Sequence, residues 1–323
     1  MISCRRPAGG SLAGRSPVHG FCDDEATRRL LRSRPPGQAL GWAAARLGGP
    51  VISARVLRGG MSSAMHLLTV RGSGGQRRHA VLRRYVRLEL NAEEPDMAVR
   101  EARALRMAES VGVPTPSLLA VDPAGGEAGV PAVLMSRLPG RVDWWPSEMD
   151  RWLRGLAGVL PHIHAAPLPP AGVLPRLAPY PQASYQPPGW ARYPAVWERA
   201  AEISQGAVPI LPAVLLHRDF HPGNVLWRRG AVCGVVDWVG ACTGPAVADV
   251  AHCRVNLLTA GADAAGRFTA MWQSAAGTVY HPLADVVAII GFLDDLRDDW
   301  GSDRLLIEDM LARAVAELGE NSR

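Results

Sequence analysis

Residues 215–227 read LLHRDFHPGNVLW and place a dense group of polar side chains between two apolar ends. The group consists of His217, Arg218, Asp219, His221 and Asn224. Polar groups destabilise a protein interior unless each one finds a hydrogen-bonding partner. The stretch therefore predicts a functional loop at the end of a buried strand, and three interpretations of that loop compete.

The first interpretation is a metal site. His217, Asp219 and His221 alternate, so on a β-strand they would face the same side and could bind a metal ion. Pro222 and Gly223 would end such a strand at once, which counts against this interpretation. The second interpretation is structural, with the two histidines hydrogen-bonded in the core and Asp219 as the cap of a turn.

The third interpretation is phosphoryl transfer. Asp219 and Asn224 lie five residues apart in HRDFHPGN, which has the form H-R-D-x-x-x-x-N of the catalytic loop of protein kinases. Asp237 follows thirteen residues after Asn224, in GVVDW, and corresponds to the aspartate that binds magnesium. Asn224 and Asp237 offer the hard oxygen ligands that Mg²⁺ prefers. Asp219 is placed to accept the proton of an attacking hydroxyl, so the pattern favours a kinase reaction with Asp219 as the base.

The same stretch, followed by GVVDWVGACTGPAVADVAH at residues 234–252, resembles the aminoglycoside phosphotransferase and choline kinase-like family. In that family a His stands where His221 lies, in place of the Lys of protein kinases, and Trp follows the second aspartate, as Trp238 does here. The resemblance implies that Asp249 braces the catalytic loop and that His217 supports it. The resemblance covers roughly residues 37–300 and is strongest in its C-terminal motifs.

The resemblance implies an α+β fold of the protein-kinase type, with a small antiparallel-sheet N-lobe and a helical C-lobe. Apolar periodicity and turn residues fit this expectation. They predict strands at 51–57, 64–70, 80–86, 117–122 and 131–138, and helices at 37–48, 94–110, 147–164, 191–204 and from 245 onward.

The expected domain boundaries follow from these elements. We expect the N-lobe at residues 37–138 and the C-lobe at residues 139–323, with an exposed Pro-rich loop at 167–188. Residues 1–36 hold seven Arg against three acidic residues and are rich in Gly, Ser and Pro, which predicts a disordered basic tail. The Trp- and Pro-rich stretch 144–197 is expected either to shape the acceptor site or to pack the C-lobe.

The resemblance also implies a nucleotide site in the N-lobe. The turn of a hairpin would contact phosphate oxygens through backbone N–H groups and hydroxyls, and its residues are Gly59, Gly60, Ser62 and Ser63. The chain has no lysine, so an arginine, Arg83 of AVLRRY, takes the position of the phosphate-binding base. Glu101, in AVREARAL, is its expected ion-pair partner.

VLMSRLPG, at residues 133–140, resembles the linker between the two lobes. Met135 would flank adenine there, and the backbone of Ser136–Leu138 would hydrogen-bond the base. The cofactors implied are ATP or GTP together with Mg²⁺. The acceptor is a hydroxyl of a small molecule, and an aminoglycoside, a macrolide, another antibiotic, a sugar, an amino alcohol and a metabolite all fit the family.

Two further groups of polar residues have mainly structural interpretations. His162 and His164 end a predicted helix and are expected to pack and cap it. In aminoglycoside-modifying relatives, acidic residues near the C-terminus bind the cationic substrate, but a solvated helix face is the favoured interpretation here. The acidic residues concerned are Asp294, Asp295, Asp298 and Asp299.

Composition narrows the class of protein. The sequence contains no run of 18 apolar residues that would predict a membrane span. Its N-terminus has no continuous apolar segment typical of a secretory signal. The five cysteines follow no zinc or disulfide spacing, which favours reduced thiols and a cytoplasmic location. The basic residues are not interleaved with aromatic residues as in nucleic-acid-binding proteins, so we expect neither a nucleic-acid nor a membrane partner.

Two alternatives to a small-molecule kinase stay open. One is a nucleotide-binding pseudokinase or regulatory module, although Asp219, Asn224 and Asp237 are all present. The other is a protein kinase, and the absence of DFG and APE-like motifs counts against it.

Overall fold

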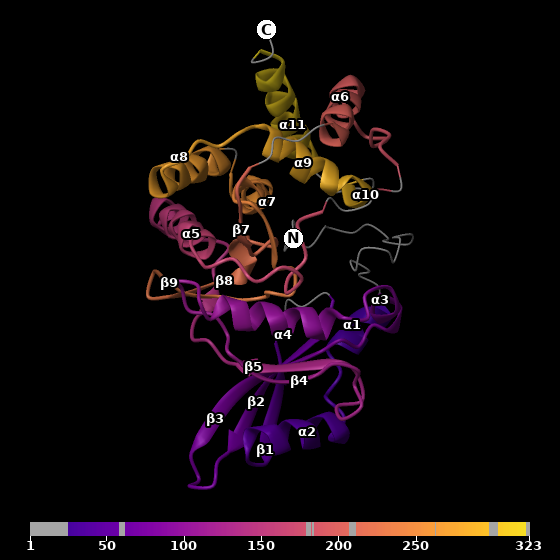
Figure 1. Ribbon diagram of the computed structural model, residues 1–323, viewed down its shortest axis with the longest axis vertical. Helices are drawn as coiled ribbons and strands as arrows, with labels where there is room; N and C mark the ends of the chain where they lie inside the picture. Colours follow the sequence, from indigo (N-terminus) through magenta and orange to yellow (C-terminus); the bar gives the residue numbers. More distant parts are fainter. Residues whose placement is uncertain are drawn as a thin grey trace. The chain divides into compact units, whose positions relative to one another are not determined.

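The computed structural model describes residues 25–57, 62–178, 182, 184–206, 211–261, 263–296 and 303–320. Its chain forms two compact units, and it passes from one to the other between Leu138 and Pro139 (Figure 1). We call them the N-lobe and the C-lobe. The short segment 111–113 belongs to the C-lobe, although its neighbours in sequence belong to the N-lobe.

The N-lobe contains an antiparallel sheet of five strands in the order β1-β2-β3-β5-β4. The strands are β1 (Val51–Val56), β2 (Ala64–Arg71), β3 (Arg77–Arg84), β4 (Leu118–Asp122) and β5 (Ala132–Ser136). In the central pairing of β3, Arg83 lies opposite Met65 on one side and Val133 on the other. The five predicted strands are therefore present.

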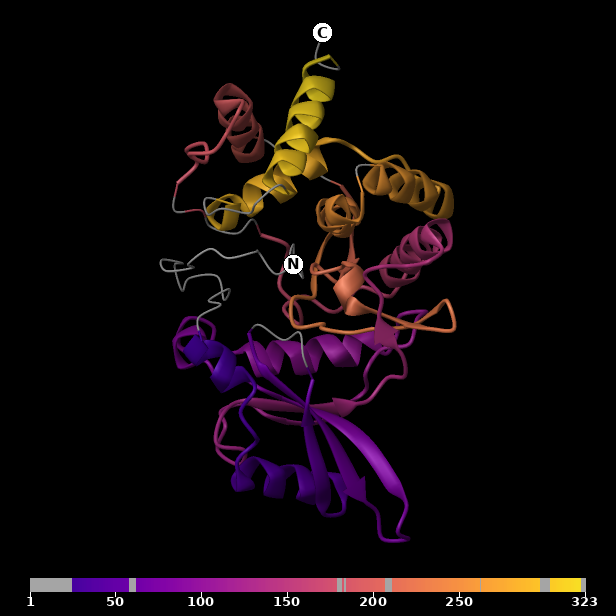
Figure 2. The ribbon, with the colours of Figure 1, turned by 180° about the vertical axis from the view of Figure 1, so that it is seen from behind.

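Helices cover both faces of this sheet. The N-lobe helices are α1 (Glu25–Leu31), α2 (Gly37–Leu47), α3 (Leu88–Glu93) and α4 (Met97–Ala108). Trp42 of α2 packs with Leu82 of β3, whereas the next residue, Arg83, contacts Glu101 of α4. Because successive strand residues point to opposite faces, α2 and α4 lie on opposite faces of the sheet (Figure 2).

The structure differs from the predicted disordered tail at residues 25–31, which form α1. Glu25 makes ion pairs with Arg28 at 3.8 Å and Arg29 at 3.7 Å. These are i,i+3 and i,i+4 pairs, which support a helix. The helix also packs against β2, and such a tertiary contact is not visible in local composition. The rest of the predicted tail, residues 1–24, lies outside the described residues.

The C-lobe has two small antiparallel sheets. Strand β7 (Ala213–Leu216) pairs with β10 (Cys242–Pro245), and β8 (Val225–Arg228) lies between β6 (Arg141–Val142) and β9 (Ala231–Val235). The LLHRDFHPGNVLW stretch runs from β7 to β8 and includes one turn of 3₁₀ helix, η2 (Pro222–Asn224). Strand β10 was not predicted, because its sequence CTGP contains Gly and Pro and is too short to show alternation.

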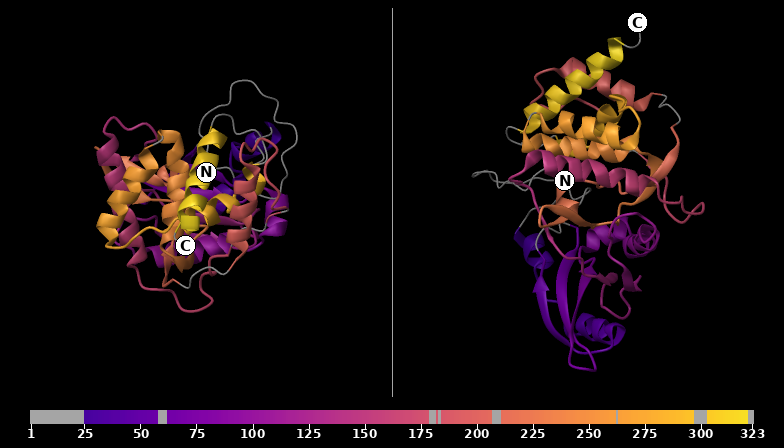
Figure 3. Two further views of the ribbon diagram at one scale, coloured as in Figure 1. Left: turned by 90° about the horizontal axis from the view of Figure 1, so that it is seen from above. Right: turned by 90° about the vertical axis from the view of Figure 1, so that its left-hand side faces the viewer.

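The remaining regular elements of the described C-lobe are helical, as predicted. Its helices are α5 (Met149–His164), α6 (Pro194–Gln205), α7 (Val247–Leu257), α8 (Ala264–Ala276), α9 (Leu283–Gly291), α10 (Leu293–Leu296) and α11 (Asp303–Glu320), with a 3₁₀ turn η3 (Leu258–Ala260). Helix α7 packs against α8 and α9, and α6, α9 and α11 pack together (Figure 3). Among the described helices, none is both long enough and apolar enough to cross a membrane.

A buried carboxylate joins α6 to α11. Glu308 of α11 has no exposed side-chain surface and accepts hydrogen bonds from the backbone N–H groups of Arg192 and Tyr193 and from Nε1 of Trp197. Arg192 also donates to it through Nε at 2.7 Å. Trp197, at the end of the Trp-rich stretch, therefore packs the C-lobe.

Candidate active site

The loop of residues 217–224 begins where β7 ends, and its backbone turns sharply at Arg218. This residue has a φ of 67°, in the left-handed region that residues with a side chain rarely adopt. The turn breaks the strand geometry that the metal interpretation of His217, Asp219 and His221 required. Across the described residues, no group of three or more His, Cys, Asp or Glu side chains is arranged to bind a metal ion.

Asp249 of α7 holds this turn in place. One carboxylate oxygen, Oδ2, accepts a hydrogen bond from the backbone N–H of His217 at 3.0 Å, and Oδ1 accepts one from the N–H of Arg218 at 2.6 Å. Nε2 of His164 lies 3.1 Å from Oδ2. Burial by itself raises the pKa of Asp249, but the contacts with His164 and His217 lower it by more, so the net pKa lies below its ordinary value.

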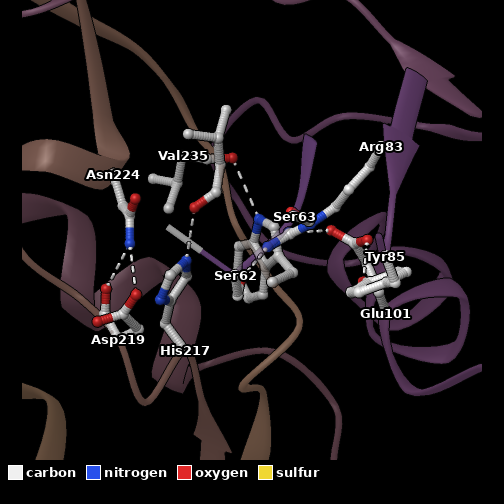
Figure 4. Close-up of polar contacts among 11 residues, drawn as sticks. Ser62, Ser63, Arg83, Tyr85, Glu101, His217, Asp219, Asn224 and Val235 are labelled. Atoms are coloured by element: carbon white, nitrogen blue, oxygen red, sulfur yellow. Dashed lines mark hydrogen bonds and ion pairs between the residues drawn. The ribbon is translucent and has the colours of Figure 1, made fainter. Parts of the chain in front are cut away.

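The expected brace is therefore present, and it includes a residue that was given a different role. His164 does not merely cap α5, because its ring contacts Asp249. His217 supports the loop as expected: its side chain is fully buried, and its Nε2 lies 2.9 Å from the carbonyl oxygen of Val236 (Figure 4).

Asp219 directly follows the turn at Arg218, and its side chain is 29 % exposed. The Nδ2 group of Asn224 donates to the backbone oxygen of Asp219 at 2.8 Å and to its Oδ2 at 3.0 Å (Figure 4). The predicted base and one predicted metal ligand are thus neighbours in one loop. Because the amide nitrogen faces Asp219, the amide oxygen of Asn224 points away from that carboxylate.

His221 shapes the end of the loop. Its Nδ1 accepts a hydrogen bond from the N–H of Gly223 at 3.0 Å, so the ring carries its proton on Nε2, which lies 3.6 Å from Oδ1 of Asp219. Burial lowers the pKa of His221 well below its usual range, which favours this neutral form. Trp144 stacks on the same ring with centroids 5.7 Å apart. A Cβ at Gly223 would lie 2.5 Å from His221 and 2.8 Å from Trp144, so the loop requires glycine there.

Asp237 lies two residues beyond β9, also with a φ of 67°. The backbone N–H of Val236 donates to the carbonyl oxygen of Asn224 at 2.9 Å, which ties the two predicted metal ligands together through their backbones. Trp238 is fully buried and donates through Nε1 to the carbonyl oxygen of Val235 (Figure 4). A non-glycine residue in the left-handed region costs about 1–3 kcal/mol of conformational free energy, and such residues cluster at functional sites. Arg218 and Asp237 are two such residues at this site.

The predicted ion pair of the N-lobe is present and deeply buried. Nη1 of Arg83 lies 2.7 Å from Oε1 of Glu101, and their side chains are 3 % and 1 % exposed. Nε of Arg83 donates to the hydroxyl of Ser63 at 2.7 Å, and the hydroxyl of Tyr85 donates to Oε2 of Glu101 at 2.7 Å (Figure 4). Glu101 is therefore not a solvated helix residue.

The hydroxyls expected at the phosphates already contact Arg83. Ser63 is buried against its Nε, and Oγ of Ser62 lies 3.5 Å from its Nη2. The two glycines of the predicted hairpin, Gly59 and Gly60, lie outside the described residues. The resemblance assigned Ser62, Ser63 and Arg83 to one nucleotide site, but it did not predict contacts between the serines and the arginine.

One group of the predicted adenine linker is bonded within the N-lobe. The N–H of Ser136 donates to the carbonyl oxygen of Ser117 at 2.9 Å, and the hydroxyl of Ser136 accepts from the N–H of Ser117 at 2.8 Å. The predicted adenine contact of the backbone from Ser136 to Leu138 stays a prediction, with the Ser136 carbonyl rather than its N–H as the group that would contact the base. Met135 is 5 % exposed in β5.

Comparison with known proteins identifies the family. Residues 53–286 match the model of the phosphotransferase enzyme family. The chain belongs to this family. The resemblance predicted from the catalytic loop is thereby confirmed. No protein among curated sequences matches the chain.

Solved structures share the fold of this phosphotransferase. The macrolide 2'-phosphotransferase MphH from Brachybacterium faecium is 18 % identical, with 86 % of this chain and 98 % of that chain covered and a TM-score of 0.54. The choline kinase LicA from Streptococcus pneumoniae is 14 % identical, with coverages of 86 % and 97 % and a TM-score of 0.57. A thermostable mutant of aminoglycoside phosphotransferase APH(4)-Ia, complexed with ADP and hygromycin B, is 18 % identical, with coverages of 86 % and 98 % and a TM-score of 0.59. The predicted kinase-like α+β fold is therefore confirmed.

The site of this phosphotransferase contains one residue that the sequence analysis missed. Nε2 of His252, on α7, lies 3.1 Å from Oδ1 of Asp219. The spacing in DVAH could have indicated this residue, because His252 lies three positions after Asp249 and therefore on the same face of a helix. In the acidic run near the C-terminus, Asp298 and Asp299 lie outside the described residues, and α10 is described through its backbone at 294–295.

Proposed function

We propose that this phosphotransferase moves the γ-phosphoryl group of ATP or GTP to a hydroxyl of a small molecule in a Mg²⁺-dependent reaction. One observation carries the proposal: Asp219 is held by Asn224 in a loop of the form H-R-D-x-x-x-x-N, with its carboxylate partly exposed. A carboxylate held in place but still accessible is suited to accept a proton from a bound alcohol.

Asp219 is the proposed base. The acceptor O–H bond breaks as a bond forms between its oxygen and the γ-phosphorus, and the proton passes to the Asp219 carboxylate. The bond between the γ-phosphorus and its bridging oxygen breaks, and the nucleoside diphosphate leaves. Such transfers depend on positioning and charge stabilisation more than on covalent catalysis, which is why a braced loop matters.

Asn224 and Asp237 are the proposed Mg²⁺ ligands. The amide oxygen of Asn224 points away from Asp219, and Asp237 directly follows Val236, whose backbone N–H donates to the carbonyl oxygen of Asn224. An amide oxygen and a carboxylate fit the ligand preference of Mg²⁺, which completes its coordination with water and phosphate oxygens. When bound, the ion would neutralise charge on the transferred phosphoryl group.

Arg83 is the proposed cation for the nucleotide phosphates, with Glu101 as its partner. The ion pair and the contact with Ser63 fix the guanidinium, so little side-chain entropy remains to be lost on nucleotide binding. Met135 and the linker backbone through Leu138 are the proposed adenine contacts. Ser62 and Ser63 would act through Arg83 as well as through their own hydroxyls.

The test is a nucleotide-consumption screen of the full chain with ATP or GTP, Mg²⁺ and a panel of hydroxyl compounds. The panel contains aminoglycosides, macrolides, choline-like amino alcohols, sugars and metabolites, and mass spectrometry identifies any phosphorylated product. We expect one class to stimulate consumption in the wild type and not in Asp219→Ala. Nucleotide binding without transfer to any compound would favour the pseudokinase alternative, and labelled protein mixtures would test a protein kinase.

A magnesium titration tests the proposed ligands separately. Asp237→Asn removes one anionic oxygen ligand and is expected to shift Mg²⁺-dependent nucleotide binding to higher Mg²⁺ concentration, because a neutral amide attracts the ion less. Fluorescence or calorimetric titration of nucleotide at several Mg²⁺ concentrations measures the shift. Asp309→Asn, on the surface of α11, is the matched control. An unchanged Mg²⁺ dependence in Asp237→Asn would remove Asp237 from the site.

A further inference from the structure

Helix α7 contacts the catalytic loop through two residues on one face. Asp249 binds the loop backbone before Asp219, and His252, three residues later, reaches the side chain of Asp219 itself. Residues three apart on a helix are neighbours on its surface, so the same helix fixes both the loop and its carboxylate. The first contact belongs to the expected brace, but nothing in the proposed function explains the second.

Each oxygen of the Asp219 carboxylate has its own neighbour. Oδ2 accepts from Nδ2 of Asn224 at 3.0 Å, and Oδ1 lies 3.1 Å from Nε2 of His252 and, at the longer distance of 3.6 Å, from Nε2 of His221. That Nε2 is buried and makes no well-aligned hydrogen bond within the described part of the chain, so the Asp219 contact is short but not linear. Catalytic hydrogen bonds often become well aligned only when substrate is bound.

Aromatic rings restrict the movement of the His252 imidazole. Its centroid lies 5.4 Å from the ring of Phe292 and 6.0 Å from the ring of His221. His221 in turn stacks on Trp144. The side chain of His252 is only 12 % exposed, so few other rotamers are open to it.

The charge state of His252 suits a hydrogen-bond donor. Burial lowers the pKa of His252, and this outweighs the hydrogen bond and charge of Asp219 and the charge of Asp249, which raise it. His221, the other titratable ring facing it, is also neutral, because its pKa is lowered by burial. A neutral imidazole beside an ionised carboxylate must carry its proton on the nitrogen that faces the oxygen, because the carboxylate can only accept.

We propose that His252 is a positioning residue that sets the rotation of the Asp219 carboxylate for proton transfer, an inference that rests on the proposed function. The terminal torsion of Asp is broad, so the loop backbone alone does not orient its two oxygens. Asn224 comes from the loop itself, whereas His252 comes from α7 and ties the carboxylate to that helix. His252 does not receive the proton: the acceptor hydroxyl loses it to Asp219, as described above.

Two substitutions separate positioning from packing. His252→Gln keeps an N–H donor near the place of Nε2, and His252→Leu keeps a similar volume without any donor. With the acceptor found in the screen, His252→Leu is expected to lower kcat about 10- to 100-fold, as loss of a residue that orients a functional side chain commonly does. The KM for nucleotide is expected to change little. His252→Gln is expected to recover most of this loss. His79→Leu, an exposed histidine of β3, is the control.

Two kinetic results would overturn the proposal. One is a kcat of His252→Leu within about twofold of the wild type, which is too small for a positioning role. The other is an equal loss in His252→Gln and His252→Leu at unchanged melting temperature, since the retained donor would then have no effect. If His252→Leu does not fold, the comparison of His252→Gln with the wild type decides: a large loss of kcat at normal stability also contradicts the proposal.

A measurement without turnover distinguishes failure of this inference from failure of the proposed function. Imidazole ¹⁵N resonances, assigned with His252→Gln, report which ring nitrogen carries the proton. We expect a proton on Nε2 of His252 in the wild type and a shift of that resonance in Asp219→Ala. A proton on Nδ1, or no response to Asp219→Ala, overturns the His252 contact even if the enzyme is active. An absence of phosphoryl transfer with the expected ¹⁵N result overturns the proposed function alone.

Discussion

Asp219 and Asp249 are the same residue type in the same lobe, and each lies beside an imidazole, yet they differ in burial and in the other groups that hold them. Asp249 is fully buried, and two backbone N–H groups and one imidazole surround its carboxylate. Asp219 is 29 % exposed, and its neighbours are side chains. A buried carboxylate that binds backbone groups holds a fold together, whereas a partly exposed carboxylate keeps access to a substrate.

The contrast shows how one helix divides two tasks. α7 uses Asp249 to stabilise the left-handed turn at Arg218, and this turn directs the next residue, Asp219, out of the strand. Without the brace, the strained turn would relax toward an extended conformation, because left-handed backbone costs about 1–3 kcal/mol for such a residue. The proposed base therefore depends on a carboxylate that never contacts substrate.

The largest expected effect is on activity and tests Asp219. Asp219→Asn keeps the shape of the side chain and an acceptor for Asn224, but it removes the proton-accepting charge. We expect kcat to fall by about 10²–10⁴-fold with little change in melting temperature. Turnover with the acceptor from the screen and a thermal unfolding curve measure the two quantities. A large fall in stability with a small fall in kcat would reverse the roles of the two aspartates.

The next effect extends the comparison to another buried carboxylate, Glu101. Arg83→Met leaves the charge of Glu101 buried without its partner, which typically costs about 3–5 kcal/mol of unfolding free energy. Adding Glu101→Gln removes that charge and keeps an acceptor for Tyr85, so we expect the double variant to regain most of the lost stability but not nucleotide binding. Denaturant unfolding and nucleotide titration measure these two effects. Additive losses of stability would mean that the pair is not coupled.

Removing the brace should affect stability first. Asp249→Ala leaves the N–H groups of His217 and Arg218 buried without an acceptor, which we expect to cost about 2–4 kcal/mol in total. The unfolding free energy measures this loss, with Asp285→Ala as a control for removing a buried C-lobe carboxylate away from the loop. If Asp249→Ala proved as stable as the wild type, the backbone hydrogen bonds would not be what holds the turn.

The smallest expected effect is a pH dependence of the same brace. The pKa of Asp249 is lowered in the folded chain below its ordinary value of 3.8, so the stability it contributes is complete above that value. As pH falls through the lowered pKa, the folded carboxylate becomes protonated and the contribution is lost. The stability difference between wild type and Asp249→Asn should therefore be constant near neutral pH and shrink in acid. A difference that grows in acid would mean that the pKa is raised instead.

Much of the fold could be predicted from the sequence, because its strands and helices follow the apolar periodicity of exposed and buried faces. The five strands of the N-lobe and helices α2, α4, α5 and α6 were all predicted from this signal. Helix α1 and strand β10 were not, since both depend on partners distant in sequence: β2 for the helix and β7 for the strand. Local propensity carries no information about such partners.

The residues of the candidate site also fall into those that the sequence predicted and those whose contacts depend on the folded chain. Spacing predicted Asp219, Asn224 and Asp237 within one motif, because a loop of fixed length must bring a base and a ligand to one place. Spacing could not show that the hydroxyl of Ser63 accepts a hydrogen bond from Arg83, or that the N–H of Ser136 donates to the carbonyl oxygen of Ser117. These contacts depend on which strand lies beside which, and strand pairing is a property of the folded chain.

By itself, then, the sequence determined the family, the kinase-like fold and the identity of the loop, because these depend on residue types at short, fixed separations. The tertiary structure alone decided which of two similar aspartates is buried and which is accessible, and that His252 lies beside the accessible one. These outcomes depend on α7 packing against a loop about thirty residues earlier in the chain, and burial and hydrogen-bond partners are fixed only when such distant segments meet.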